Sequence, residues 1–401
     1  MLFRSIAVFV ETWMAGGVGN ALGNYDEMFF RTRVHENSRI YSAQGLESEG
    51  TTADFMSKAN SYYYGTRFMS YLAHEHSPEK LIEWIKRKDG SKRGFAANFR
   101  HVFGENISDS WSNWINFEKK FQLENIKNLN QNEITVDTKI SDKILGGVSH
   151  AYYDKKRNKI YVAVNFPGKV PHLASLDINS GKIKKLKDIK GPALFNVTSL
   201  AYDEKNDILF YTTDNSANRD LYSYDLKNGQ NTLLQKNLRS GDLAYNNKDQ
   251  SLWAVMHMNG INTVIRIPKF NSKTPNQYYS VWEQKYTLPY GHDIFDLDIS
   301  PDGDKLSAAV ADYFGNQYLN IYNINSLDNQ DKDNIQFDEV FNFEVSSPQT
   351  FKFTEDGKYL IGSSFYSGVS NIFRVDVNSL DIEVMSNALT GYFRPIQIDS
   401  E

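Results

Sequence analysis

Two His-Glu pairs, His35-Glu36 and His74-Glu75, are the residues of this chain whose types could bind a catalytic zinc ion. A zinc hydrolase built on such a pair needs a second histidine four positions after the first, because side chains four residues apart share one helix face. Arg39 and Pro78 occupy those positions. His76 follows His74 by two residues, and on a helix these imidazoles point to different faces. The sequence therefore predicts no metal site at these pairs.

An acidic run is the second group that could bind a cation. It consists of Asp293, Asp296, Asp298, Asp302 and Asp304. A calcium loop of the EF-hand type requires a fixed ladder of Asp and Gly followed by a distal Glu, and that register is missing here. We interpret the run as residues of a strand and a turn.

Other catalytic patterns are missing from the sequence. It contains no Gly-x-Ser-x-Gly elbow of a serine hydrolase and no phosphate-binding loop of the Walker type. It contains no cysteine, which excludes disulfides, thiolate ligands and a cysteine nucleophile. The net charge of −5 is spread along the chain without a basic stripe, so the sequence gives no indication of nucleic-acid binding.

The second half of the chain repeats one phrase, in which polar and apolar residues alternate and an Asn/Ser turn follows. Its copies lie at residues 173–180, 221–228, 319–326 and 372–379, with a fifth at 264–270. Alternation predicts a strand with one buried face, and the tight turn Ser300-Pro-Asp-Gly303 precedes such a strand. A period of about 40 to 50 residues with several short strands is typical of the blades of a β-propeller.

The repeats predict about five blades. Phe210, Trp253, Leu306 and Leu360 are expected in the interior of successive blades. Residues 395–401 resemble residues 348–354, the strand that opens the fifth unit. We therefore expect an incomplete ring whose next blade has only begun, although closure with five blades is an alternative.

Residues 1–123 are expected to form a small helical domain, 124–147 a linker and 148–401 the propeller. Ser77 before Pro78, Asp54 and Asp109 are the predicted helix caps. Gly65 lies inside an expected helix, where glycine costs about 1 kcal/mol relative to alanine. Close packing or a functional neighbour is expected there.

The helical half resembles the gluzincin metallopeptidases, zinc enzymes related to aminopeptidases. The residues that carry the resemblance run in order from residue 6 to residue 114. They are Ile6-Ala-Val-Phe-Val-Glu11, Gly16-Gly-Val-Gly19, Tyr25-Asp-Glu-Met28, Arg31, Tyr62-Tyr-Tyr-Gly65, Arg67-Phe68, Tyr71-Leu72, Pro78-Glu-Lys-Leu81, Phe103-Gly104, Trp111 and Trp114.

The resemblance also implies which catalytic residues are missing. The paired His motif does not occur, and Arg4-Ser5 stand where the family has the third zinc ligand, a Glu in a Glu-Gly pair. Tyr62 matches a tyrosine that stabilises an oxyanion in related aminopeptidases, and Glu11 matches a family acid. Both also have a structural interpretation, Tyr62 as a core residue and Glu11 as a carboxylate on a helix surface. We expect no competent catalytic residue, no metal ligand and no cofactor.

The propeller resembles the TolB type, whose blades carry the Ser-Pro-Asp-Gly turn. Gluzincin domains fused to such propellers occur in bacterial envelope proteins, so the resemblance implies the periplasm or an outer-membrane association. The apolar run at residues 6–10 is closed by Glu11 and is too short to be a signal peptide or a membrane span. The expected function is a non-catalytic remnant whose propeller binds a protein or peptide.

Two other functions stay open. The chain could belong to a zinc metallopeptidase whose His-Glu-x-x-His helix is missing from this sequence, in which case zinc is the cofactor. It could also be a structural scaffold unrelated to peptidases. The residues do not identify a partner or substrate.

Overall fold

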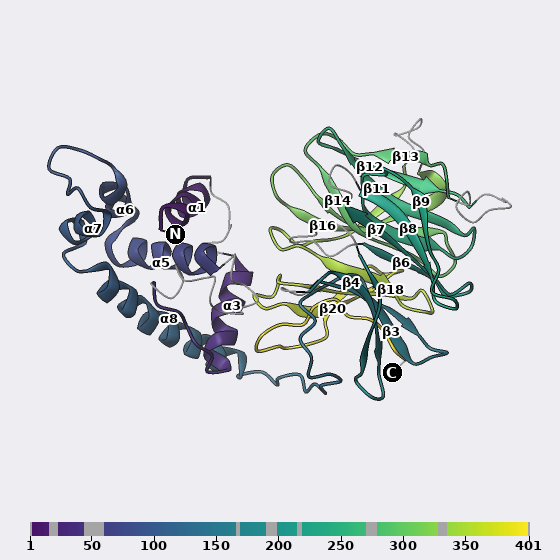
Figure 1. Ribbon diagram of the computed structural model, residues 1–401, viewed down its shortest axis with the longest axis horizontal. Helices are drawn as coiled ribbons and strands as arrows, with labels where there is room; N and C mark the ends of the chain where they lie inside the picture. The colour runs from purple at the N-terminus through teal and green to yellow at the C-terminus, as the bar shows by residue number, and fades with distance from the viewer. Residues whose placement is uncertain are drawn as a thin grey trace. The chain divides into compact units, whose positions relative to one another are not determined.

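The computed structural model describes residues 2–15, 23–43, 60–165, 169–189, 199–214, 219–269, 279–327 and 335–399. The chain forms two compact units. The first comprises residues 1–135 with 387–391, and the second comprises residues 136–386 with 392–401. The first unit is helical and the second consists of sheets (Figure 1).

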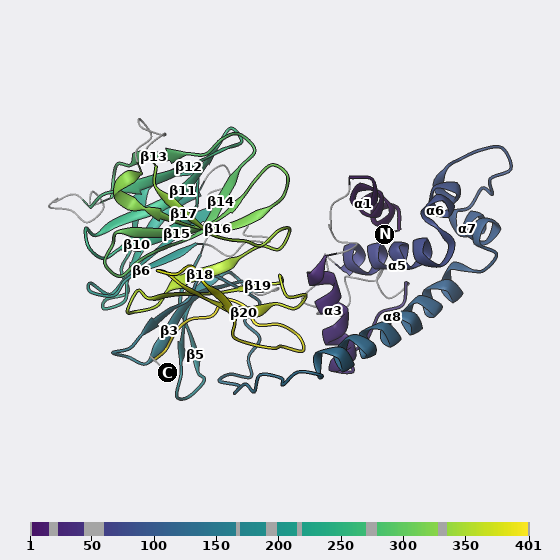
Figure 2. The same ribbon diagram turned by 180° about the vertical axis from the view of Figure 1, so that it is seen from behind.

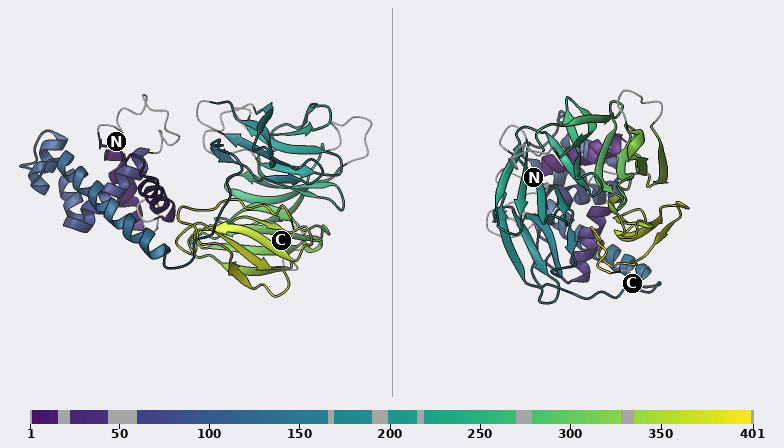
Figure 3. Two further views of the ribbon diagram at one scale, coloured as in Figure 1. Left: turned by 90° about the horizontal axis from the view of Figure 1, so that it is seen from below. Right: turned by 90° about the vertical axis from the view of Figure 1, so that its right-hand side faces the viewer.

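Six helices form the described part of the first unit, and Figure 3 shows them from two further directions. They are α1 (Leu2–Ala15), α3 (Asn24–His35), α5 (Asn60–His76), α6 (Pro78–Ile85), α7 (Phe95–Phe103) and α8 (Ile107–Leu129). Their apolar faces meet in one core rich in aromatic side chains, including Phe30, Phe68, Trp111 and Trp114. No helix in the described ranges combines the length and the apolarity needed to cross a membrane.

The helix ends differ in part from the expectation. Ser77 precedes α6 as expected but makes no capping hydrogen bond through its side chain. Asn106, not Asp109, is the N-cap of α8, because that helix begins earlier than the sequence pattern suggested. Asp109 lies in its first turn and accepts a hydrogen bond from the Asn106 side chain. Asp54 lies outside the described residues.

Close packing between helices accounts for the glycine at position 65. A Cβ atom at this position would overlap the side chain of Ser5 on α1. The missing side chain therefore lets α1 and α5 approach closely, which is the structural reason for tolerating glycine within a helix.

An ion-pair network joins three helices of this unit. The Arg67 guanidinium of α5 donates two hydrogen bonds of 3.0 Å to Glu118 of α8 and lies 3.1 Å from Glu27 of α3. Gln122 donates a further bond of 2.8 Å to Glu118. Arg31 donates from Nε to the carbonyl oxygen of Leu389 at 2.8 Å, so segment 387–391 packs within the same unit.

The second unit is a five-bladed β-propeller. Each blade is an antiparallel sheet. In blades two to five the strands pair in sequence order, and in blade one the first two strands both pair with the third. Blade one contains β1 (Gly147–Val148), β2 (Tyr152–Asp154), β3 (Lys159–Asn165), β4 (His172–Asp177) and β5 (Ile183–Asp188). Blade two contains β6 (Leu200–Asp203), β7 (Ile208–Asp214), β8 (Arg219–Asp225) and β9 (Asn231–Gln235).

The remaining three blades have four strands each. Blade three contains β10 (Ser240–Asn246), β11 (Ser251–Met258), β12 (Ile261–Ile267) and β13 (Glu283–Thr287). Blade four contains β14 (Asp293–Ile299), β15 (Lys305–Ala311), β16 (Gln317–Asn323) and β17 (Phe337–Asn342). Blade five contains β18 (Gln349–Phe353), β19 (Tyr359–Ser364), β20 (Asn371–Asp376) and β21 (Ile382–Val384).

The repeated phrase of the sequence corresponds to the same strand in every blade. Its copies are β4, β8, β12, β16 and β20. Four of the copies end in an Asp or Asn whose side chain accepts a backbone N–H of the following turn, as Asp177 does from Ser180 at 3.0 Å. The expected interior residues Phe210, Trp253, Leu306 and Leu360 are all buried, which confirms the register.

Domain boundaries differ from the expectation at one end of the linker. Helix α8 continues to Leu129, into the segment expected to be linker, whereas β1 begins at Gly147 as the sequence indicated. Residues 395–399 form no strand, although their sequence resembles the strand that opens blade five. Figures 1 and 2 show the yellow strands of blade five next to the teal strands of blade one from opposite sides.

Candidate functional site

The first strands of blades two to five contact one another in succession, as expected for the strands nearest the axis of a propeller. In three of these blades the first strand contains a β-bulge. The register shifts lie at Asp242 in β10, Asp296 in β14 and Thr350 in β18. Asp296 and Thr350 have φ of 54° and 55°, values that are rare for residues other than glycine. Arg394, which follows blade five, has φ of 52°. A bulge changes the direction of the side chains in its strand. Here each bulge directs one polar side chain toward the adjacent blade.

These residues form a ladder from blade to blade. The N–H of Leu243 donates to Ser199 Oγ at 2.8 Å, and the N–H of Asp296 donates to Asp242 Oδ2 at 3.1 Å. The N–H of Thr350 in turn donates to Asp296 Oδ2 at 2.8 Å. Each bulged strand therefore satisfies a backbone donor of the next blade, and together the blades surround a common axis.

Charged side chains gather along this axis, and we call them the axial cluster. Its members are His150, Asp242, Asp296, Asp298, Lys352 and Arg394. His150 Nε2 lies 2.9 Å from Asp296 Oδ1, a contact between blades one and four that are not neighbours in the ring. Asp296 keeps 23% of its side-chain surface exposed, so the cluster is deep but accessible to solvent.

The two cations of the cluster join blade one to the end of the propeller. Lys352 Nζ donates to the carbonyl oxygen of Ala151 at 3.1 Å and lies 3.6 Å from the centre of the Tyr152 ring. The Arg394 guanidinium donates to the carbonyl oxygen of Val148. Both cations therefore have backbone partners, and neither lies within ion-pairing distance of an Asp of the axial cluster among the described contacts.

Burial and neighbouring charges separate the carboxyl groups of the cluster. Burial, and then the charge of Asp296, raise the pKa of Asp242. Burial also opposes ionisation of Asp296, but the hydrogen bond with His150 and the N–H of Thr350 hold its pKa below the ordinary value. Burial raises the pKa of Asp298, against the charge of Lys352. Burial lowers the pKa of Lys352 to about 8.

Two polar groups of the axis have no partner. His150 Nδ1 and Thr350 Oγ1 make no hydrogen bond within the described structure. Both residues are buried, with exposures of 7% and 2%. Buried polar groups without a protein partner normally bind water or a ligand. These two flank Asp296, since His150 contacts its carboxylate and Thr350 donates a backbone N–H to it.

Large apolar side chains are exposed on three loops of blades three and four, and we call them the aromatic surface. It consists of Met258, Ile261, Tyr290, Tyr313 and Phe314, which are 46%, 38%, 81%, 66% and 75% exposed. The Tyr313 and Phe314 rings lie 4.0 Å apart, and His292 lies against Tyr313 at 5.9 Å. The Asn262 side chain donates to the carbonyl oxygen of His292 at 2.9 Å, which joins the loops of the two blades.

The aromatic surface and the opening of the axis lie at the same end of the propeller. In an antiparallel blade the start of the first strand, the connection between strands two and three and the end of strand four share one end. His257 links the two features, because its Nε2 lies 2.7 Å from where a Cβ of Gly241 would be. Met258 follows His257, and Asp242 follows Gly241.

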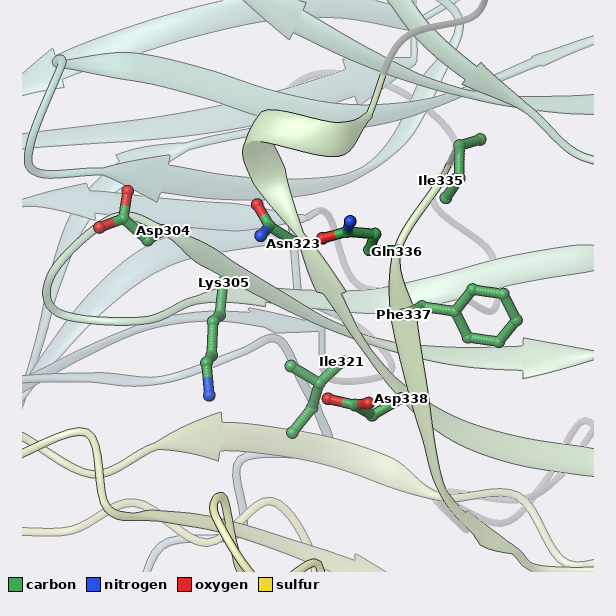
Figure 4. Close-up of a pocket in the computed structure, with 8 residues that line it drawn as sticks. All are labelled: Asp304, Lys305, Ile321, Asn323, Ile335, Gln336, Phe337 and Asp338. Carbon is green, nitrogen blue, oxygen red and sulfur yellow. The ribbon is translucent and has the colours of Figure 1, made fainter. Parts of the chain in front are cut away.

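A groove at the opposite end of blade four is a second candidate. It encloses about 540 Å³ and is lined by Asp304, Lys305, Ile321, Asn323, Ile335, Gln336, Phe337 and Asp338. Figure 4 shows Ile321 between Lys305 and Asp338, with Asn323 and Gln336 above them. Asp304 is already paired with Lys248 at 2.6 Å. The groove has no buried charged group, and it is therefore a weaker candidate than the axis.

The candidate residues of the helical unit do not lie next to a group of side chains that could bind a metal ion within the described ranges. Tyr62 lies half-buried on α5 and Glu11 is exposed on α1. His74 is 69% exposed and contacts Glu75, whereas His76 lies against the Phe103 ring. Residue 4 belongs to α1. Within the described ranges no three His, Cys, Asp or Glu side chains are arranged to hold a metal ion.

The acidic run lies in strand β14, which contains Asp293, Asp296 and Asp298, and in the turn after it, as the sequence indicated. Asp302 stabilises the turn before β15 by accepting from Ser300 Oγ and from the N–H of Asp304. Asp296 and Asp298 in addition accept backbone N–H groups of blade five near the axis, which the sequence did not indicate.

No known family model matches the chain, and no curated protein matches it. Among solved structures, it is similar to TolB from Acinetobacter baumannii, with 13% identity, coverage of 60% of this chain and 55% of that chain, and a TM-score of 0.46. It is also similar to a protein assigned as TolB from Agrobacterium tumefaciens, with 12% identity, coverage of 59% and 79%, and a TM-score of 0.44. The tricorn protease matches with 12% identity, coverage of 61% and 27%, and a TM-score of 0.42.

These likenesses concern the arrangement of strands, since the identities are 12 to 13%. The chain spans about half the length of the first of these proteins.

Proposed function

We propose that this chain is a binding protein whose propeller captures an extended segment of a partner protein at the aromatic surface. The observation that carries the proposal is the exposure of five large apolar side chains on three adjoining loops. Single exposed apolar residues are common, but a contiguous group of them usually marks a site of interaction. Aromatic side chains in particular supply much of the binding energy at protein interfaces.

The axial cluster supports binding at this end of the propeller. A peptide that covers Tyr290 and Tyr313 would reach the opening of the axis, since β14 begins at Asp293 and its bulge is at Asp296. Apolar pockets or surfaces with a few convergent polar groups are the usual form of a specific site.

We also propose that the helical unit is a non-catalytic relative of the gluzincin metallopeptidases and that the protein acts in the bacterial periplasm or at the outer membrane. The order of matching residues between Ile6 and Trp114 supports this relationship. The missing paired His motif and Arg4 at the third ligand position argue against zinc catalysis by this chain. The alternative is a peptidase whose catalytic helix lies outside this sequence.

Metal analysis distinguishes the two. The purified chain is expected to hold less than stoichiometric zinc, because it lacks both the paired histidines and the third ligand of the family. Elemental analysis after dialysis against a metal-free buffer checks this. One tightly bound zinc per chain would instead favour the peptidase.

A peptide selection tests binding at the aromatic surface. The full chain is immobilised and presented with a phage library of random seven-residue peptides. We expect enrichment of sequences with apolar and aromatic residues, whose affinity falls about tenfold or more when Tyr313→Ser and Phe314→Ser are combined.

The matched control is Phe337→Ser, which removes a half-exposed aromatic side chain at the groove on the opposite end. It should leave the affinity unchanged. Recovery of no sequence above an unrelated control protein, or equal loss with Phe337→Ser, would overturn the proposed binding surface.

A further inference from the structure

We propose that the axial cluster binds an ammonium or guanidinium group of the captured segment, with Asp242 as its counter-ion. This inference rests on the proposed function, and it assigns a charged subsite next to the aromatic surface. The ligand group would come from a lysine or arginine side chain. The sign of its charge follows from which members of the cluster already have partners.

The cations of the cluster are occupied. Lys352 donates to the Ala151 carbonyl oxygen and covers the Tyr152 ring, and Arg394 donates to the Val148 carbonyl oxygen. A ligand carboxylate would have to replace these contacts, which hold blade one to the end of the propeller. An anionic ligand is therefore disfavoured.

The carboxylates are not equally occupied. Asp296 contacts His150 and accepts from Thr350, and Asp298 accepts from the N–H of Phe353 at 2.8 Å. Asp242 accepts only the N–H of Asp296 among the described contacts, through one of its two oxygens. No described Lys, Arg or His lies within ion-pairing distance of Asp242. It is the carboxyl group at the axis with the greatest capacity for an added cation.

Unpartnered buried groups supply hydrogen-bonding capacity for a ligand at this site. His150 Nδ1 and Thr350 Oγ1 lack partners and flank Asp296, whose N–H binds Asp242. A threonine hydroxyl accepts as well as donates, so it can bind an ammonium proton. An ammonium offers three donors and a guanidinium five, which suits a site with several separate acceptors.

The position of Asp242 also fits a side chain that enters from the aromatic surface. Gly241 precedes it, and the His257 ring occupies the space beside that glycine. Met258 of the aromatic surface follows His257. A segment with a cationic residue next to an apolar one could therefore occupy both sites.

The peptide selection provides the test. Wild-type chain is expected to enrich sequences with Lys or Arg next to an aromatic residue. Asp242→Asn should remove the enrichment of Lys and Arg while keeping that of aromatic residues, because the amide retains an oxygen for the Asp296 N–H but not the charge. Asp338→Asn, an exposed carboxylate at the opposite end, is the matched control and should retain the wild-type preference.

A synthetic pair then measures the effect. One selected peptide is compared with the same peptide whose lysine is acetylated, by calorimetry on the full chain. The lysine form should bind about tenfold or more tightly to wild type. Asp242→Asn should bind the two forms alike.

The pH dependence gives a readout that needs no variant. Binding requires the ionised form of Asp242, and burial and Asp296 raise its pKa, whereas the nearby His150, His257 and Arg394 favour the ionised form. Affinity for the lysine peptide should therefore rise with pH, and the rise should lie above the pH range in which an ordinary aspartate ionises.

The outcomes separate the two proposals. Enrichment of aromatic residues without any preference for Lys or Arg would overturn the cation site and leave the aromatic surface intact. Equal affinity for the lysine and acetyl-lysine peptides would do the same. Recovery of no peptide would overturn both.

Discussion

Asp296 illustrates how one residue at the axis combines strain, burial and several partners. Its backbone lies in the left-handed region at φ 54°, and its carboxylate contacts both His150 and the N–H of Thr350. The strained backbone and the buried charge each cost free energy when they are not compensated by other contacts. Together the contacts stabilise the ionised carboxylate and fix the bulge.

Replacing this side chain should destabilise the propeller. Asp296→Ala leaves the Thr350 N–H and the His150 ring without their acceptor, and we expect a loss of about 1 to 3 kcal/mol in the free energy of unfolding. Denaturant unfolding measures it. Asp293→Ala removes an exposed carboxylate of the same acidic run and should change the stability by less than about 0.5 kcal/mol. Equal effects would show that the axial contacts contribute nothing.

Asp26 of α3 is a buried carboxyl of a different kind. It is 2% exposed, and its Oδ2 has no partner among the described atoms. Burial raises its pKa to about 8, against the charge of Arg67, while Glu27 raises it further. The carboxyl group is therefore predominantly neutral in the folded state at neutral pH.

The helical unit should consequently lose stability as the pH rises toward 8. A carboxyl group whose pKa is raised in the folded state stabilises that state fully at pH values below its unfolded pKa of about 4. This contribution is lost as the pH rises from the unfolded pKa to the folded pKa. The slope is at most about 1.4 kcal/mol for each pH unit. Asp26→Asn should reduce it, whereas the exposed Asp89→Asn should not.

Hydrogen exchange of α3, corrected for its intrinsic pH dependence, provides the measurement. A wild-type slope that is identical to that of Asp26→Asn would contradict the raised pKa.

At the scale of elements, the blades are held by apolar residues on both faces of their middle strands. Phe210, Trp253, Leu306 and Leu360 lie on the second strands and are at most 1% exposed. Leu360 packs in a cluster that combines Phe373 and Val375 of its own blade with Leu319 of blade four. Burial between neighbouring sheets therefore stabilises the propeller as well as the individual blade.

Truncating this core should be costly. Leu360→Ala is expected to lower the free energy of unfolding by about 2 to 5 kcal/mol, because it removes buried apolar contacts and leaves a cavity. Equilibrium unfolding in denaturant measures the change. Val384→Ala, a truncation at a half-exposed position of the same blade, should cost much less. A small effect at Leu360 would contradict the assigned register.

At the scale of the whole propeller, side chains and not strand pairs join blade five to blade one. The sheets of the described structure are separate, and no strand of one pairs with a strand of the other. Lys352 with Ala151 and Arg394 with Val148 are two of the contacts that make the connection. We therefore expect the stability of this junction to depend on these two cations.

Lys352→Ala tests the junction. We expect faster hydrogen exchange in β2 and β3 and a stability loss of about 1 to 3 kcal/mol, since the change also removes the charge of Lys352, which favours the ionised form of the buried Asp298. Lys358→Ala removes an exposed lysine from the following turn and should leave the exchange of blade one unchanged. Unchanged exchange with Lys352→Ala would assign closure to other contacts.

The sequence determined the repeat, the number of described blades and their interior positions. Those features follow from local patterns, because strand alternation and turn chemistry are properties of neighbouring residues, as at Ser300–Gly303 and Leu360. The cause of Gly65 was only partly predictable. Close packing was expected, but its contact, Ser5, belongs to a different helix.

Only the tertiary structure decided the axial cluster. Its members come from blades one, three, four and five and from the segment after blade five, so no local pattern relates them. The bulges at Asp242, Asp296 and Thr350 also change which way the first strands direct their side chains. Regular alternation alone would have assigned those side chains differently, because a bulge inserts a residue and shifts the two-residue period. The residues with the clearest potential for binding were therefore recognised only once the ring had brought them together.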